Sequence, residues 1–318
     1  MRKFIIDTDT GSDDAVALLL ALREPAVEVL AITTVCGNVV MEQATINAFR
    51  SIAAAGTYVP PVYKGAYHPL RKELATAENV HGKDGMGDIG LPIPDLKAEN
   101  EHAVEAILRI VGENPGEIEL VTLGPATNVA LAMMKDPDTM KKVKHIYSMG
   151  SGGYGMGNVT SVAEFNVFAD AEAFRVMTEF PVPKTFIGID ICWLPTAFFT
   201  KEDIDTIRES GECGKFAMDC NSTLIAYTEK VFGKYQLDLP DPYAMGVALW
   251  PEIVTEEHDC HCFVCTAQDP TYGQVVVDYQ KFDAVDSSKM LSNEPNARVI
   301  KLVDTELFKT KVKENLKG

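Results

Sequence analysis

The sequence predicts an α/β protein in which helices cover both faces of a mainly parallel central sheet. Short, almost wholly apolar runs alternate with helical patterns along most of the 318 residues. Strands without polar alternation are typical of parallel sheets that are buried on both sides. No linker, repeat or low-complexity segment interrupts this alternation. We therefore expect one domain over residues 1–318.

The first half of the chain supplies most of the expected elements. Residues 4–6 form a short apolar strand, and Asp13 is expected to cap the buried helix that stops before Pro25. Further strands are expected over 27–35, 118–123, 145–149 and 185–189, and further helices over 41–55, 127–134, 201–210 and 215–231.

The rest of the chain has a different character. Two β-rich runs, 258–266 and 274–279, are expected to form a small hairpin, and 297–303 leads into a lysine-rich terminal helix. The stretch 65–99 is rich in Gly, His and Asp and shows no periodicity. Loops of that length in compact domains are usually functional or disordered.

Composition excludes several classes of partner. With 29 Lys and Arg against 46 Asp and Glu, the net charge is −17. Nucleic acids and anionic membranes require a basic face, so neither is expected as a partner. No apolar run approaches a membrane span, and the apolar stretch after Lys3 is too short for a signal peptide. Seven scattered cysteines fit reduced thiols. We expect a cytoplasmic protein.

Four aspartates, Asp7, Asp9, Asp13 and Asp14, lie between the first strand and the first helix. Ligands of open α/β sheets bind beyond the carboxyl ends of the strands. Four carboxylates in one place repel each other unless a cation or a helix N-terminus compensates. Such hard oxygen ligands favour Ca²⁺ or Mg²⁺. A capped turn alone would need only one carboxylate.

The same segment permits a second interpretation. An apolar strand followed by Asp-x-Asp-x-Thr also resembles the start of the haloacid dehalogenase-like phosphatases, which use Mg²⁺. That family needs a later Gly-Asp-x-x-x-Asp motif, but Gly87-Asp88 is followed by Pro92 at the position of the second acid. The phosphatase therefore remains the alternative.

Five further segments place polar groups at strand ends or in the long loop. They are 31–38, 81–87, 123–128, 157–167 and 240–244, and their candidate site residues are Asn38, His81, Leu123, Asn158, Glu164, Asn166 and Asp241. Together with the aspartates, and in this order, they closely resemble the inosine–uridine-preferring nucleoside hydrolase family. The resemblance extends from residue 3 to about residue 280.

This resemblance implies a fold and an activity. The fold is a single α/β domain with a Rossmann-like sheet, the nucleoside hydrolase fold. The activity is hydrolysis of the N-glycosidic bond of ribonucleosides to base and ribose, in nucleoside salvage. Members of the family are usually homodimers or homotetramers.

The resemblance also implies roles for individual residues. One Ca²⁺ per chain is held by the side chains of Asp9, Asp14 and Asp241 and by the carbonyl of Leu123. Asp9 is also the general base that activates a calcium-bound water. Asp7 supports the metal ligands without binding the ion itself. The groups expected to contact the substrate are Asp13, Asn38, Asn158, Glu164, Asn166 and, nearby, His81.

The residue types suit this chemistry. Cleavage of a ribosyl C–N bond passes through an oxocarbenium-like state, which carboxylates stabilise. Asn side chains both donate and accept hydrogen bonds, as ribose hydroxyls require. Lys83 is the only basic residue in the motif segments, and none contains Arg. This favours a neutral nucleoside over a nucleotide, whose phosphate would want Arg.

One position departs from the family pattern. Many members carry a His, associated with protonation of the leaving base, immediately before the residue that corresponds to Asp241. This chain has Pro240 there, and proline has no proton to give. The candidates for a substitute acid are Tyr227, Tyr235, His81 and Cys192.

Two further features allow more than one interpretation. His258, Cys260, Cys262 and Cys265 invite a zinc site, but alternate side chains of a strand point to opposite faces, and buried cysteine is common. Trp193 could border a base pocket or belong to the core. A protein that binds nucleosides without cleaving them is the remaining alternative, and the presence of Asp9 argues against it.

Overall fold

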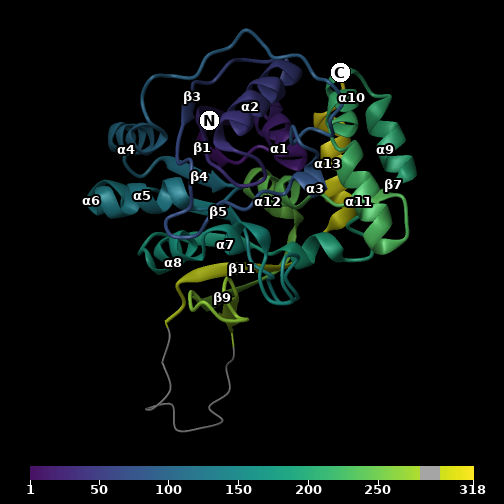
Figure 1. Ribbon diagram of the computed structural model, residues 1–318. Coiled ribbons are helices and arrows are strands. Elements are labelled where there is room, and N and C mark those ends of the chain that lie inside the picture. Colours follow the sequence, from purple (N-terminus) through teal and green to yellow (C-terminus); the bar gives the residue numbers. More distant parts are fainter. Residues whose placement is uncertain (280–293) are drawn as a thin grey trace.

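The computed structural model describes residues 1–279 and 294–318 (Figure 1). A nine-stranded sheet runs through its centre in the order β10-β9-β11-β6-β5-β4-β1-β2-β3. Its strands are β1 (Arg2–Thr8), β2 (Val27–Thr34), β3 (Val62–Lys64), β4 (Ile118–Thr122), β5 (His145–Met149), β6 (Lys184–Ile187), β9 (Val254–Val264), β10 (Val275–Asp278) and β11 (Ala297–Val303). A separate ribbon pairs β7 (Phe199–Thr200) with β8 (Gln236–Leu237).

Helices cover both faces of the sheet (Figure 1). They are α1 (Ser12–Arg23), α2 (Met41–Ala55), α3 (Glu78–His81), α4 (Ala103–Glu113), α5 (Thr127–Lys135), α6 (Pro137–Met140), α7 (Phe165–Ala169), α8 (Ala171–Glu179), α9 (Lys201–Arg208), α10 (Glu212–Asp219), α11 (Ser222–Phe232), α12 (Pro240–Leu249) and α13 (Thr305–Asn315), with 3₁₀ turns η1 (Ile189–Trp193) and η2 (Pro251–Ile253). None of the helices in the described part of the chain is long and apolar enough for a membrane crossing.

The expected sheet is confirmed. Pairing is parallel from β3 to β11, and only β9 and β10 run antiparallel to their neighbours. Neighbouring residues of β1 enter different cores: Phe4 and Ile6 pack with α1 and α12, and Ile5 packs with α4 and α5. This division follows from the alternation of side chains along a strand, and it explains why the strand is apolar throughout.

The prediction of one helix over 215–231 is wrong. The chain breaks between α10 and α11 at Asn221, whose side-chain Nδ2 donates to the carbonyl of Ala217 at 2.8 Å and to that of Ser12 at 2.9 Å. Asn221 thereby ties this turn to the start of α1. A long-range bond of this kind overrides the local helical pattern.

The prediction that Asp13 caps the first helix is also wrong. The N-cap of α1 is Gly11, and the Asp14 Oδ2 accepts a hydrogen bond from the Gly11 amide at 2.8 Å. Asp14 closes the first turn, as an acidic residue at the third helical position commonly does. Asp13 therefore lies inside the first turn, with its carboxylate free for other contacts.

The topology gathers polar residues at one edge of the sheet. The carboxyl ends of β1, β2, β4 and β5 lie side by side, so the segments that follow them meet there. Helix α12 packs along α1, and the short helix α3 contacts α11 on the same side of the molecule (Figure 1).

Candidate functional site

A cluster of buried carboxylates lies where α1 and α12 begin. Asp13 and Asp14 from the first turn of α1, and Asp241 from the first turn of α12, each offer an oxygen within 4.8 Å of the other two. All three residues are buried. The two helices pack together, so both N-terminal dipoles favour negative charge at this point.

Asp9, directly after β1, completes the acidic group. Its Oδ2 accepts a hydrogen bond from the Asn38 amide at 2.6 Å, whereas its Oδ1 has no hydrogen-bond partner among the described residues. The carboxylate is held between two glycines. A Cβ at Gly37 would lie 2.0 Å from Oδ2, and one at Gly124 would lie 2.6 Å from Oδ1. Any larger residue at either position would displace Asp9.

The pKa values of three of these carboxylates are raised. Burial, together with repulsion from the neighbouring carboxylates, raises the pKa of Asp9 and of Asp241 well above the ordinary value. Burial and the Asp13 charge raise the pKa of Asp14 to about 6. In the parts of the chain that the structure describes, no Lys or Arg pairs with any of the four carboxylates. The donor set therefore fits a divalent cation that prefers oxygen.

Asn38, which follows β2, links the two halves of the acidic group. Its amide bonds Asp9, and its side-chain Nδ2 donates to the Asp14 Oδ2 at 3.0 Å. Asn38 is thus brought directly to the aspartates, as its position after the second strand predicts.

Asp7 supports this group from within β1. Its Oδ1 accepts hydrogen bonds from Thr33 at 2.5 Å and from the Asn128 side chain at 2.8 Å. Asn128 also donates to the Thr34 carbonyl and accepts from the Ala66 amide. The supporting roles of Thr33 and Asn128 were not predicted, although Asn128 ends one of the motif segments.

Leu123 and Asn166 lie together beside Asp7. The Leu123 amide donates to the Asp7 carbonyl at 2.8 Å, and the Leu123 carbonyl accepts a hydrogen bond from the Asn166 Nδ2 at 2.6 Å. The carbonyl thus lies at the expected strand end and faces a residue expected to bind ribose. Its role as a metal ligand stays a prediction.

Glu164 organises the chain before α7. Its buried carboxylate accepts hydrogen bonds from the amides of Asn166, Val167 and Ser151. Burial raises its pKa to about 7. Asn158 is exposed, and its Oδ1 accepts a hydrogen bond from the Phe165 amide at 2.9 Å. Both side chains therefore shape the loop that carries Asn166, and their contacts to substrate stay predictions.

His81, the last residue of α3, reaches the cluster from the long loop. Its Nδ1 lies 2.9 Å from the Ser12 hydroxyl and 3.7 Å from the Asp13 Oδ1. Burial lowers its pKa, which keeps the ring neutral at pH 7. Asn47 of α2 anchors this loop by donating to the carbonyls of Asp84 and Thr10.

The cysteines of β9 belong to the core. Cys260 and Cys262 are buried in the cluster beneath α8, and the Cys260 thiol lies 3.6 Å from the Tyr154 hydroxyl. Within residues 1–279 and 294–318, the only group of three or more convergent metal ligands is the aspartate cluster. The core interpretation of these cysteines is therefore preferred.

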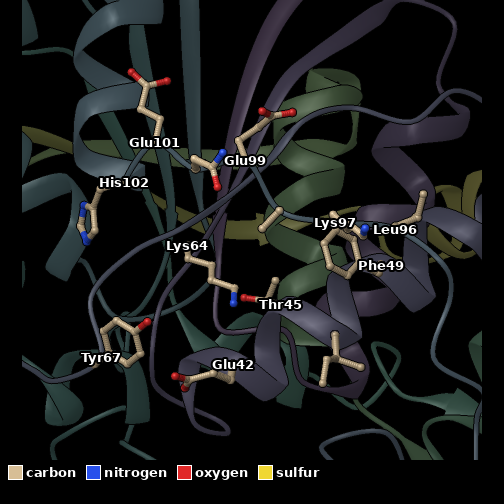
Figure 2. A pocket seen from close by; sticks show the side chains of 13 residues that line it. Glu42, Thr45, Phe49, Lys64, Tyr67, Leu96, Lys97, Glu99, Glu101 and His102 are labelled. Carbon is tan, nitrogen blue, oxygen red and sulfur yellow. The ribbon is translucent and has the colours of Figure 1, made fainter.

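A cavity of about 750 Å³ lies away from the aspartates, between α2, β3 and the segment that precedes α4 (Figure 2). Its lining includes charges of both signs, among them Glu42, Lys64 and Lys97. Size alone does not identify the site, because this cavity contains none of the converging carboxylates. The chemistry points to the edge of the sheet.

The raised pKa values predict the pH dependence of stability when divalent ions are removed by a chelator. The pKa of Asp7 and of Asp14 is raised to about 6 and that of Glu164 to about 7, mainly by burial. The folded protein then binds more protons than the unfolded chain between about pH 4 and pH 7, so the free energy of unfolding falls as pH rises. A tenfold difference in proton affinity between the folded and unfolded chain corresponds to about 1.4 kcal/mol. Urea unfolding at pH 5 and pH 7.5 measures this, and equal or greater stability at pH 7.5 would contradict it.

Comparisons with known proteins cover most of this chain. Residues 4–310 match the family model described as inosine-uridine preferring nucleoside hydrolase. A pyrimidine-specific ribonucleoside hydrolase of Escherichia coli is 33% identical, with 100% of this chain and 97% of that protein covered. Uridine nucleosidase 1 of Arabidopsis thaliana is 37% identical over 80% of this chain and 76% of its own length.

Solved structures show the same fold. A plant nucleoside hydrolase superposes with a TM-score of 0.93 at 32% identity, covering 100% of this chain and 99% of that one. A purine-preferring ribonucleoside hydrolase from Gardnerella vaginalis gives a TM-score of 0.89 at 29% identity, covering 99% and 98%.

Proposed function

Because the chain belongs to the inosine-uridine preferring nucleoside hydrolase family and is thus an N-glycosyl hydrolase, we propose that it cleaves neutral ribonucleosides at the aspartate cluster. The products are the free base and ribose. The observation that carries this proposal is the convergence of Asp13, Asp14 and Asp241 next to an Asp9 oxygen that no described residue engages.

The cluster is proposed to hold one Ca²⁺. Asp9, Asp14 and Asp241 are the side-chain ligands that the family resemblance implies, and Leu123 adds a carbonyl. Asp13, Asp14 and Asp241 offer oxygens within 4.8 Å of one another, so Asp13 would also lie beside a bound ion. An all-oxygen donor set favours Ca²⁺ over zinc. When bound, the ion lowers the pKa of a coordinated water and offsets the repulsion between the carboxylates.

Asp9 is proposed as the general base. Its Oδ2 is fixed by the Asn38 amide, which leaves Oδ1 to take a proton from the attacking water. A base works best when its position is fixed before the reaction begins, and the glycine walls on both sides of this carboxylate provide that restraint.

The surrounding groups are proposed to bind the sugar. Asp13, Asn38 and Asn166 offer acceptors and donors for ribose hydroxyls, with Glu164, Asn158 and His81 around them. The summed negative charge stabilises the positive charge that develops on the ribosyl ring as the base departs. These roles account for the presence of so many carboxylates in one buried cluster.

A reducing-sugar assay over a panel of purine and pyrimidine nucleosides, with added Ca²⁺ or with a chelator, tests the proposal. We expect sugar and free base in equal amounts, and loss of both with the chelator. Phosphate release from nucleotides would support the phosphatase alternative. Tight nucleoside binding without sugar release would support a binding protein.

From the resemblance we further propose that the chain forms one domain, that it assembles as a homodimer or homotetramer, and that it acts in nucleoside salvage in the cytoplasm.

Metal binding should also govern stability through Asp241. Asp241→Asn removes one buried carboxylate from a group that repels itself, so in the presence of a chelator this variant should unfold at a higher temperature than the wild type. Ca²⁺ at 100 times its Kd should stabilise the wild type by about 2.7 kcal/mol and the variant far less.

Thermal unfolding with Ca²⁺ or with a chelator measures both effects. The exposed Asp138, which pairs with Lys141 on the surface, is the matched control, and Asp138→Asn should change neither value. An equal Ca²⁺ response in wild type and Asp241→Asn would exclude Asp241 as a ligand.

A further inference from the structure

A carboxylate outside the aspartate cluster joins the end of β6 to the loop that follows β5. Asp190 lies in η1, and its Oδ2 accepts a hydrogen bond from the Tyr154 amide at 2.8 Å. Its Oδ1 lies between two glycines: a Cβ at Gly153 would be 2.0 Å from this oxygen, and one at Gly188 would be 2.5 Å from it. The Asp190 side chain is therefore enclosed between the strand end and the loop.

The loop that Asp190 contacts comprises residues 151–157, and four of its seven residues are glycine. We call it the glycine-rich loop. Glycine loses more conformational freedom than other residues when it becomes ordered, so such a loop depends on contacts that hold it. Its first residue, Ser151, has a φ of 86°, a conformation that persists only where the surroundings impose it.

Two further hydrogen bonds connect this loop internally and to β6. The Ser151 carbonyl accepts one from the Ile189 amide at 3.1 Å, and the Ser151 Oγ accepts one from the Gly153 amide at 3.1 Å. The conformation of Ser151 therefore depends on the same strand end and the same loop residues that enclose Asp190.

A chain of hydrogen bonds leads from the glycine-rich loop to the candidate site. The Ser151 amide donates to the Glu164 Oε2 at 3.3 Å, and the Glu164 carboxylate also accepts from the Asn166 amide at 3.0 Å. The Asn166 Nδ2 in turn donates to the Leu123 carbonyl at 2.6 Å. Asn158 directly follows the loop. Three residues proposed to contact ribose are therefore attached to this loop or directly follow it.

Glu164 makes this arrangement sensitive to the loop. Its carboxylate is only 2% exposed, and the Ser151 amide is one of the few donors that reach it. A buried carboxylate that loses a donor is destabilised in place, so displacement of the loop would shift Glu164 and, with it, Asn166.

We propose that Asp190 is a positioning residue for the sugar: it fixes the glycine-rich loop against the end of β6, and the loop keeps Asn158, Glu164 and Asn166 where they would contact ribose. The inference rests on the proposed function, because it needs a substrate that contains ribose. None of these contacts involves the base, so the loss of Asp190 should affect every riboside by the same factor.

Asp190→Ala and Asp190→Asn test the proposal as a pair. Alanine removes the acceptor of the Tyr154 amide, so kcat/KM should fall by at least about tenfold, as loss of a hydrogen bond to a carboxylate implies. The fall should be equal for inosine, uridine and nitrophenyl riboside. Asparagine keeps one oxygen for the Tyr154 amide and replaces an oxygen that has no partner among the described residues, so it should stay within about threefold of wild type.

Amide hydrogen exchange reports on the loop without turnover. Peptides that cover residues 150–158 should exchange faster in Asp190→Ala than in the wild type, and Asp190→Asn should restore slow exchange. Unchanged exchange in Asp190→Ala would show that Asp190 does not fix the loop. Faster exchange with an unchanged kcat/KM would show that the position of the loop does not matter to the substrate. Either result overturns the proposal.

Gly188→Ala displaces the loop while Asp190 is retained. Gly188 has a φ of −78°, which alanine adopts without strain, but its Cβ would lie 2.5 Å from both the Asp190 Oδ1 and the Gly153 Cα. We expect the same faster exchange and the same loss for all three ribosides. Combined with Asp190→Ala, it should cause less than the product of the two separate losses. It also carries the test if Asp190→Ala does not fold.

Asp136 supplies a matched control. It also accepts a backbone amide, that of Thr139 at 3.0 Å, but it caps α6, at the outer end of α5 (Figure 1). Asp136→Ala should lower the unfolding temperature and leave kcat/KM unchanged. A loss in Asp190→Ala that spares nitrophenyl riboside, or an Asp190→Asn variant as impaired as Asp190→Ala, would contradict the proposed role.

Failure of the proposed function gives a different result. A wild type that releases no sugar from any riboside would refute the hydrolase proposal. Hydrogen exchange in residues 150–158 would still decide whether Asp190 fixes the glycine-rich loop.

Discussion

Asp9→Asn is expected to lower kcat by at least about 10²–10⁴-fold, the range associated with loss of a positioned general base, while the protein stays folded. The replacement has nearly the same size, and its oxygen can still accept the bond from the Asn38 amide. What it loses is the basic oxygen that no described residue engages and one charge of the proposed metal site. Asp9→Ala should be at least as impaired. Sugar release and circular dichroism, measured on the same preparation, test the loss of activity and the retained fold.

An independent substitution tests the same geometry. Gly37→Ala would place a Cβ 2.0 Å from the Asp9 Oδ2, so this carboxylate must move even though every charged group is retained. We expect Gly37→Ala to lower kcat in the same direction as Asp9→Asn. Gly56, at the exposed end of α2, has no atom within 4 Å of an added Cβ, and its substitution by Asn should leave kcat unchanged. A folded Asp9→Asn variant within tenfold of wild type would remove Asp9 from the proposed mechanism.

The central sheet could be predicted because the amino-acid composition of its strands indicates that they are buried. Residues such as Phe4, Ile5 and Ile6 are apolar without alternation, and the structure buries them in two cores on opposite faces. The break at Asn221 could not be predicted, because it depends on a hydrogen bond to Ser12, more than 200 residues away in the chain. The pattern of residues along a segment indicates only whether that segment favours a helix, and a tertiary hydrogen bond of this kind can override that preference.

The candidate site, like the fold, could be predicted from the sequence only in part. Asp9, Asp13 and Asp14 are visible in the sequence because they share one short segment after a strand. The proximity of Asp241 to them depends on the packing of α12 along α1, which family resemblance implied and periodicity did not.

Substrates with good leaving groups are expected to be cleaved far faster than natural nucleosides. Pro240 begins α12 immediately before Asp241 and cannot protonate a departing base. The aspartates and asparagines that are proposed to bind ribose are present, so activation of the sugar should survive this departure from the family pattern. A missing general acid is worth about 10²–10⁴-fold, and we expect kcat for nitrophenyl riboside to exceed that for inosine or uridine by about this factor.

The structure places the four candidates for a substitute acid in different environments. Tyr235 is 39% exposed, and Cys192 is wholly buried, with its thiol pKa raised well above the ordinary value by burial. His81 is neutral, because burial lowers its pKa, and its Nδ1 lies 2.9 Å from the Ser12 hydroxyl. Tyr227 is partly buried in the core cluster that includes α11.

Pro240→His tests the role of this position directly. A histidine at the first position of α12 restores a group that can carry a proton to the base, so hydrolysis of inosine and uridine should accelerate while nitrophenyl riboside, which needs no such proton, should not. If natural nucleosides are already cleaved as fast as nitrophenyl riboside, a substitute acid exists. Tyr227→Phe, Tyr235→Phe, His81→Ala and Cys192→Ala then identify it, because only its loss should slow natural substrates and spare the nitrophenyl compound. Four variants that all retain the natural-substrate rate would mean that the proton reaches the base from a group outside this set.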